Sequence, residues 1–158
     1  MKHWNVSVSV LDPDLHTAKY VLARCPFLFT VGTSSFSFSI SVAHIYIATT
    51  VLAIAARGHA KTELYGILMQ EAKTFCGMAI VEFWKSVEIV QAFILLAVFP
   101  PPARRWDEDK SWMYLGCAMR LATELDLNRQ MSGPFANEMA EREYLNRTRT
   151  WLICHNLE

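Results

Sequence analysis

The sequence predicts an all-α fold, and three observations lead to this prediction. Two segments with helical apolar spacing, 86–99 and 107–129, are separated by a run of three consecutive prolines, 100–102. Proline lacks the amide hydrogen and its ring clashes with the preceding turn, so the run ends one helix before the next begins. Residues that favour helix N-caps precede several apolar segments. Where apolar and polar residues alternate, as a strand requires, no second such segment is available as a clear partner strand. We therefore expect a bundle-like set of helices.

Composition and charge exclude some function classes. The chain has 158 residues, of which 53% are apolar and 19% charged, and its formal net charge is zero. One domain with a sizeable core is expected at this length. A chain without basic surplus lacks the charge that phosphate-backbone binding needs, so we do not expect it to read DNA itself. The four cysteines are far apart and form no C-x-x-C pair, so we expect reduced, buried thiols in an intracellular protein: Cys25, Cys76, Cys117 and Cys154.

The sequence pattern of the first third of the chain fits more than one structure. Residues 1–10 fit a short strand or a linker, and Asp12 followed by Pro13 is a good start for a helix that ends at Pro26. Residues 26–56 contain no Asp, Glu, Lys or Arg, and their part 36–56 is just long enough to cross a bilayer as a helix. Its many Ser and Thr residues dilute the hydrophobicity. A membrane span and a buried helix both remain open for this segment.

A helix is expected from Thr62 onward, with Glu63 in its first turn. Lys61, Gln70, Glu71 and Lys73 are predicted to face outward. Helical spacing places the following residues on its buried stripe: Leu64, Ile67, Leu68, Ala72, Phe75, and Met78 or Ala79.

The next two helices form a predicted hairpin around the prolines. Ser86 is a plausible cap for a helix that is apolar on nearly all sides, so this helix is expected at the buried centre. The second helix is predicted to start near Asp107, where acidic side chains favour the positive end of the helix dipole. The predicted buried stripe of this helix consists of Trp112, Leu115, Met119 and Ala122. Its predicted solvent-exposed side carries Lys110, Arg120 and Glu124.

Residues 130–134 read as a loop, after which Asn137 can cap a last helix. Glu138 and Arg142 are spaced for a surface ion pair. The predicted inner face of this helix consists of Leu145, Thr148, Trp151, Leu152 and His155.

No catalytic grouping is present. The sequence has no H-E-x-x-H, no phosphate-cradling glycine loop and no nucleophile elbow, and its five histidines lie in different elements. Cys154 and His155 are adjacent, but neighbouring helical residues point about 100° apart and do not form a joint site. We therefore expect no catalytic, cofactor-binding or metal-binding residues, and no enzyme.

An ordered set of short motifs runs through the second half of the chain. It consists of a helix with a Gln-Ala pair, an aromatic residue, a glycine, Ala-x-Arg, Leu-x-Leu-x-Arg, and basic residues before a tryptophan. The matching positions are Gln91-Ala92, Trp112, Gly116, Ala118-Met119-Arg120, Leu125-Asp126-Leu127-Asn128-Arg129 and Arg147-Thr148-Arg149-Thr150-Trp151. This order resembles the central regulatory domain of fungal transcription factors of the zinc binuclear cluster type, also called the xylanolytic-activator-type regulatory domain. The resemblance covers the whole chain as a partial domain and is best over residues 86–158.

The chain departs from this family at several points. The family usually has glycine where Asp126 stands and histidine where Asn128 stands, and its arginine run before the tryptophan is denser. Its zinc cluster needs six closely spaced cysteines, which this sequence lacks, so zinc is expected only in a cluster outside this chain. Relatives continue almost directly from the Pro-Phe-Leu piece to a small-residue helix, which implies that residues 32–51 are an insertion or a retained intron.

The resemblance implies a regulatory and interaction module of a fungal transcription regulator of RNA polymerase II genes, located in the nucleus. Its implied partners are proteins or a second copy bound through helices, and a small-molecule effector; DNA would be bound only through the missing domain, and no membrane partner is expected. The alternative is a small membrane-anchored helical protein with a span near 36–56. The candidate structural or regulatory residues are Trp112, Gly116, Arg120, Arg129, Arg147 and Trp151, with the tryptophans expected as core anchors and the arginines as helix-end or inter-helix hydrogen-bond donors.

Overall fold

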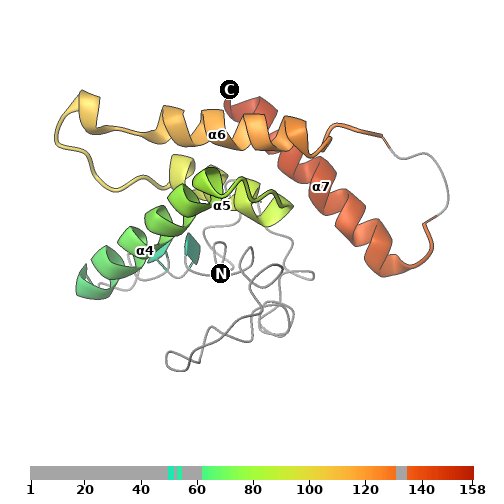
Figure 1. Cartoon of the computed structure of the whole chain (residues 1–158), viewed down its shortest axis with the longest axis horizontal. Coiled ribbons are helices and arrows are strands. Elements are labelled where there is room, and N and C mark those ends of the chain that lie inside the picture. The colour runs from blue at the N-terminus through green and yellow to red at the C-terminus, as the bar shows by residue number, and fades with distance from the viewer. Residues whose placement is uncertain (1–49, 52, 55–61, 131–134) are drawn as a thin grey trace.

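The computed structural model describes residues 50–51, 53–54, 62–130 and 135–158 (Figure 1). Within these ranges 75% of the residues are helical and none is in a strand, which confirms the all-α prediction. The helices are α4 (Thr62–Val81), α5 (Val87–Val98), α6 (Ser111–Glu124) and α7 (Glu138–Leu157), with the 3-10 turn η2 (Trp106–Glu108) before α6. The segment 1–10, the helix from Asp12, Cys25 and almost all of 32–51 lie outside the described residues.

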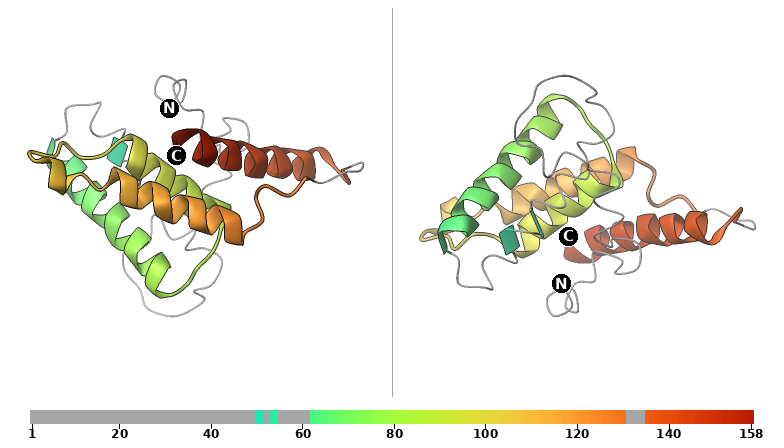
Figure 2. Two further views of the ribbon diagram at one scale, coloured as in Figure 1. Left: turned by 90° about the horizontal axis from the view of Figure 1, so that it is seen from above. Right: turned by 90° about the horizontal axis from the view of Figure 1, so that it is seen from below.

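Helix α5 is the buried centre, as its apolar circumference predicts. All eight residues from Ile89 to Leu96 are buried. α5 contacts α4, α6 and α7, and Figures 1 and 2 show it between α4 and α6. The predicted cap is also confirmed, because the Ser86 Oγ accepts a hydrogen bond from the Ile89 amide at 3.3 Å. Two described residues of the 32–51 segment, Thr50 and Val51, are buried as well.

The predicted hairpin of α5 and α6 is present, but its second helix begins later than predicted. α6 starts at Ser111 instead of near Asp107, and Asp107 and Glu108 belong to η2. The physical reason is local: the Asp109 carboxylate accepts hydrogen bonds from the Ser111 amide at 2.9 Å and from its hydroxyl at 2.7 Å. This carboxylate thus satisfies a free amide at the helix start.

The buried face of α6 is rotated from the predicted one. Trp112, predicted as a core anchor, is 81% exposed, and Leu115 and Met119 are only half-buried. Ala118 and Ala122 are fully buried, with Tyr114, Cys117 and Leu121 packed beside them. Small side chains let two helix axes approach closely, so the alanine side of α6 packs against the apolar α5. The large side chain of Trp112 is left outside.

The buried stripe of α4 is also narrower than predicted. Leu64 and Ile67 are exposed, whereas Ala72 is buried and Leu68 and Phe75 are partly buried as predicted; of the alternatives Met78 and Ala79, it is Ala79 that is buried. Lys73, predicted to face out, is half-buried. The buried positions of α4 are Met69, Ala72, Cys76 and Ala79, which recur every three or four residues.

The inner face of α7 is polar where an apolar one is predicted. Leu145, Leu152 and His155 are exposed, and Trp151 and Thr148 are half-buried. The buried residues are Asn146, Thr150 and Cys154. The start of α7 is as predicted, because the Asn137 side chain accepts from the Ala140 amide at 2.8 Å, and Arg142 pairs with Glu138 at 3.1 Å.

None of the described helices is long and apolar enough to span a bilayer, and most of the segment 36–56 lies outside the described ranges. Cys76 and Cys154 are buried free thiols as predicted, and Cys117 is a half-buried one.

Candidate functional site

A buried polar network joins α5 to α7. The Gln91 amide nitrogen donates to the Asn146 side-chain oxygen at 2.9 Å and to the Thr150 hydroxyl oxygen at 3.0 Å. Thr150 in turn donates to the Asn146 carbonyl at 2.8 Å. Gln91 and Thr150 are fully buried. Because a buried polar group costs free energy unless it is hydrogen-bonded, the network fixes the position of α7 on α5.

A second contact ties α7 to the end of α6. The Arg147 guanidinium donates to the Leu125 carbonyl at 2.8 Å, so Arg147 is the helix-end donor that the sequence leads us to expect of its arginines. Helix ends leave carbonyl groups without partners in the helix, and a cation is favoured there by the helix dipole. Arg147 thereby links α7 to α6.

The chain turns sharply where α6 ends. Asp126 has a positive φ of 49°, the Asp126 amide donates to the Thr123 carbonyl, and the Leu127 amide to the Ala122 carbonyl, both at 3.1 Å. These two bonds form a Schellman motif, in which the position of Asp126 is usually occupied by glycine. The conformation gives a physical reason for the glycine that the resembled family has here.

Three of the candidate residues line one pocket on the outer side of α6. Trp112, Gly116 and Arg120 surround a hollow of about 260 Å³, together with Leu115, Met119 and Glu158. A Cβ atom at Gly116 would meet nothing within 4 Å, so the glycine is not required by packing and leaves the hollow open. Met113, next to Trp112, is also largely exposed. The pocket is mainly apolar, with one cation and one carboxylate at its edge.

The remaining candidates lie apart from this pocket. Trp151 is half-buried against the core and its ring is stacked on His155, with ring centroids 6.3 Å apart and planes 5° apart. Arg129 is exposed, after the end of α6. Sequence reasoning missed Asn146 and Thr150, although Asn146, Thr150 and Cys154 follow one another at intervals of four residues. Polar residues at such spacing normally indicate a solvated face.

No metal site is visible in the described parts of the chain, which bring no three His, Cys, Asp or Glu side chains together in a suitable group. The described helices present an exposed pocket on α6, and side-chain hydrogen bonds connect α7 to α5 and to α6.

Comparison with known proteins gives one distant likeness. The chain is similar to Protein priB of Lentinula edodes, with 27% identity over 153 residues that cover 94% of this chain and 20% of that protein. It therefore spans about a fifth of the length of the curated relative it matches. No family model and no solved structure matches the chain.

Proposed function

We propose that this chain is a helical regulatory and interaction module of a fungal DNA-binding transcription regulator of the zinc binuclear cluster type. One observation carries the proposal: motif segments far apart in the sequence contact one another. The Gln-Ala segment meets the basic segment through the Gln91 hydrogen bonds to Asn146 and Thr150, and the basic segment meets the Leu-x-Leu segment through Arg147. A motif set whose members hold one another in place supports a shared architecture with that family.

The proposed role is to bind protein partners through the outer side of α6. Tryptophan and arginine are enriched among the residues that dominate binding energy at protein interfaces. Trp112 is 81% exposed, and it lines an apolar hollow together with Arg120, so both side chains are available to a partner that fills the hollow. In this proposal the module works without catalysis in the nucleus, and DNA and zinc are bound only by a cluster domain outside this sequence.

The length relation to priB agrees with a module inside a larger protein, because the matched stretch is 20% of that chain. In such a protein the module would regulate the activity of other domains of the same polypeptide.

A reporter assay tests this role. The chain is placed between a heterologous DNA-binding domain and an activation domain in a fungal host, and compared with an unstructured linker of equal length. We expect a lower reporter output with the chain, and recovery with Trp112→Ala, since truncating an interface tryptophan commonly costs about 2 kcal/mol or more of binding.

The matched control is Trp106→Ala. Trp106 is 93% exposed but does not line the α6 pocket, so its truncation should leave the output low. Equal output from the chain and the linker would contradict the regulatory role. Equal recovery by both tryptophan variants would contradict the role of the α6 pocket.

A further inference from the structure

The turn between α4 and α5, residues 82–86, presents a large apolar side chain to solvent. Phe83 is 80% exposed, and Val81 before it, the last residue of α4, is 72% exposed. Phe83 also has a positive φ of 54°, which its Cβ atom makes costly. In both views of Figure 2, α4 ends on the side away from α6 and α7. The turn therefore holds an aromatic ring in solvent at the cost of backbone strain, and strained residues cluster at binding sites.

The hollow on the outer side of α6 suits one large apolar side chain. Its volume of about 260 Å³ is below the roughly 300–1,000 Å³ of pockets that enclose a small-molecule ligand. Trp112, Leu115 and Met119 form its apolar walls. At Gly116 a Cβ atom would meet nothing within 4 Å, so the hollow is open beside this residue. An aromatic ring that enters the hollow would be buried against these walls.

The charges beside Phe83 and at the edge of the hollow are complementary. Glu82 directly precedes Phe83, Arg120 lines the hollow, and both side chains are exposed. Within the part of the chain that the structure describes, neither of them forms an ion pair. Glu158 at the same edge has an opposite charge in Lys85, two residues after Phe83. Complementary charges of this kind orient two protein surfaces and exclude wrong partners.

The turn and the hollow lie apart within one chain. Lys85 of the turn pairs at 2.7 Å with Glu124, the last residue of α6. Trp112 lies near the other end of α6, about 18 Å away along the helix axis at 1.5 Å per residue. Phe83 does not line the hollow of its own chain. A contact between the ring and the hollow therefore requires two copies.

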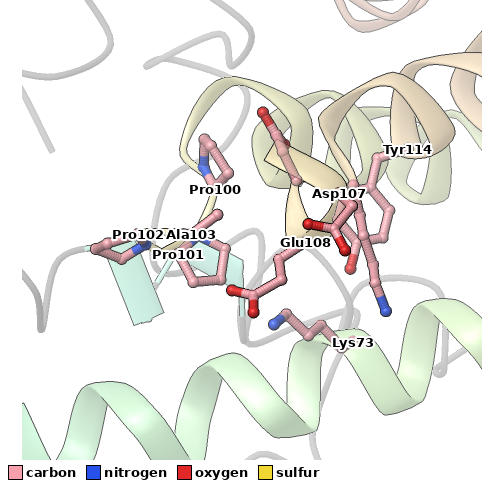
Figure 3. Close-up of a pocket in the computed structure, with 10 residues that line it drawn as sticks. Lys73, Pro100, Pro101, Pro102, Ala103, Asp107, Glu108 and Tyr114 are labelled. Atoms are coloured by element: carbon pink, nitrogen blue, oxygen red, sulfur yellow. The ribbon is translucent and has the colours of Figure 1, made fainter. Parts of the chain in front are cut away.

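The larger pocket of the described residues does not suit the ring. It has a volume of about 460 Å³ and lies between α4, the proline segment and η2, and five of its ten lining residues are charged. Figure 3 shows Lys73 extending from α4 toward the carboxylate of Glu108. An aromatic ring in this pocket would remove charged groups from water without replacing their hydrogen bonds. The hollow on α6 is the better match.

We propose that Phe83 of one copy of this chain inserts into the α6 hollow of a second copy, with Glu82 beside Arg120 of that copy. The turn and the hollow are different surfaces, so the contact is head-to-tail and leaves each pair with one unused turn and one unused hollow. Such self-association rests on the proposed function, because a second copy becomes the partner of the same hollow.

The test measures the mass of the purified full chain by analytical ultracentrifugation. Concentrations from about 1 µM to 1 mM cover the Kd values expected of a small, transient interface. We expect an average mass that rises with concentration and passes that of a dimer. Phe83→Gly should weaken the association about tenfold or more, because truncating an aromatic side chain that fills a pocket is costly to binding. Glycine also relieves the strained backbone, so this variant keeps its fold.

A second variant acts on the other surface. Gly116→Leu places a side chain in the hollow, and leucine favours a helix more than glycine does, so we expect a folded chain that does not associate. Phe83→Gly retains the hollow and Gly116→Leu retains the ring. A mixture of the two variants should therefore form a one-to-one dimer that grows no further. Ile67→Ala is the matched control, since Ile67 is 62% exposed on α4 away from the turn, and it should associate as the unmodified chain does.

Several results would overturn the contact. They are a monomer at every concentration, unchanged association in both variants, and a mixture of the variants that stays monomeric. A loss in Ile67→Ala as large as that in Phe83→Gly would mean that unspecific apolar contacts hold the copies together. A monomeric chain that still lowers reporter output in a Trp112-dependent way would overturn self-association and leave the proposed function standing.

Discussion

Two residues adopt a left-handed backbone conformation that their side chains do not favour. Phe83 has a φ of 54° and Asp126 a φ of 49°. Phe83 follows α4 as Asp126 follows α6: the Phe83 amide donates to the Ile80 carbonyl at 3.3 Å and the Trp84 amide to the Ala79 carbonyl at 2.9 Å. Both are Schellman motifs, and the Cβ atom makes this conformation costly for residues other than glycine. Aspartate tolerates it better than phenylalanine does.

Glycine at these positions should therefore stabilise the chain. We expect Phe83→Gly to raise the free energy of unfolding by about 1 kcal/mol and Asp126→Gly by about half as much. Phe83 is 80% exposed, so its removal loses little packing. Urea unfolding measures the change. Alanine retains the Cβ atom and should give less stability than glycine at each position; alanine variants as stable as the glycine ones would rule out backbone strain as the cause.

At the scale of the elements, α7 packs on α5 through polar groups. Gln91, Asn146 and Thr150 are buried, and the Gln91 amide of α5 donates a hydrogen bond to each of the two α7 side chains, with Cys154 continuing the same stripe of α7. This contact is directional, because a rotation of α7 would break both Gln91 hydrogen bonds at once. It sets the orientation of the helix more narrowly than apolar contacts alone would.

Removing one partner of this joint should destabilise the fold. Asn146→Ala leaves Gln91 with one of its two amide hydrogen bonds, and we expect a loss of about 1–3 kcal/mol in the free energy of unfolding. The same substitution at the exposed Asn128 is the control and should change stability by less than about 0.5 kcal/mol. Denaturant titrations of both variants give the comparison. Equal losses at the two sites would mean that the buried network does not stabilise α7.

At the scale of the whole molecule, the core keeps its thiols protonated. Burial, and then the neighbouring Cys117, raises the pKa of Cys76 to about 12, and burial, and then Glu158, raises the pKa of Cys154 to about 12. An unfolded thiol has a pKa of about 8.5. The unfolded state therefore loses these protons first as the pH rises.

Stability should fall in alkali for this reason. The contribution of the two thiols is fully present below about pH 8.5 and is lost as the pH rises toward about 12. We expect the free energy of unfolding, measured by urea titration between about pH 8 and pH 10.5, to decline more steeply in the unmodified chain than in Cys76→Ala. A decline of the same slope in the variant would show that the Cys76 thiol is not responsible.

Part of the candidate site followed from the sequence. The ordered motifs indicated Trp112, Gly116 and Arg120, and the structure brings these three to one pocket. The exposure of Trp112 was not predictable from spacing, because a tryptophan at helical spacing fits a core position as well as a surface one. The pocket of about 460 Å³ that α4, the proline segment and η2 line was not predictable, since its walls meet only through the packing of α4 against α5.

The starts of α5 and α7 and the end of α5 are predictable from local sequence, because Ser86, Asn137 and the prolines act on their immediate neighbours. The central position of α5 is predictable as well, since a helix that is apolar on nearly all sides must be covered. The sides of α4, α6 and α7 that face α5 depend instead on how the helices pack together. An amphipathic helix has several stripes of apolar or small residues that could be buried. The stripe that becomes buried is the one whose shape and polarity match the neighbouring helix. For α7 that neighbour is Gln91, whose amide makes a polar stripe the buried one.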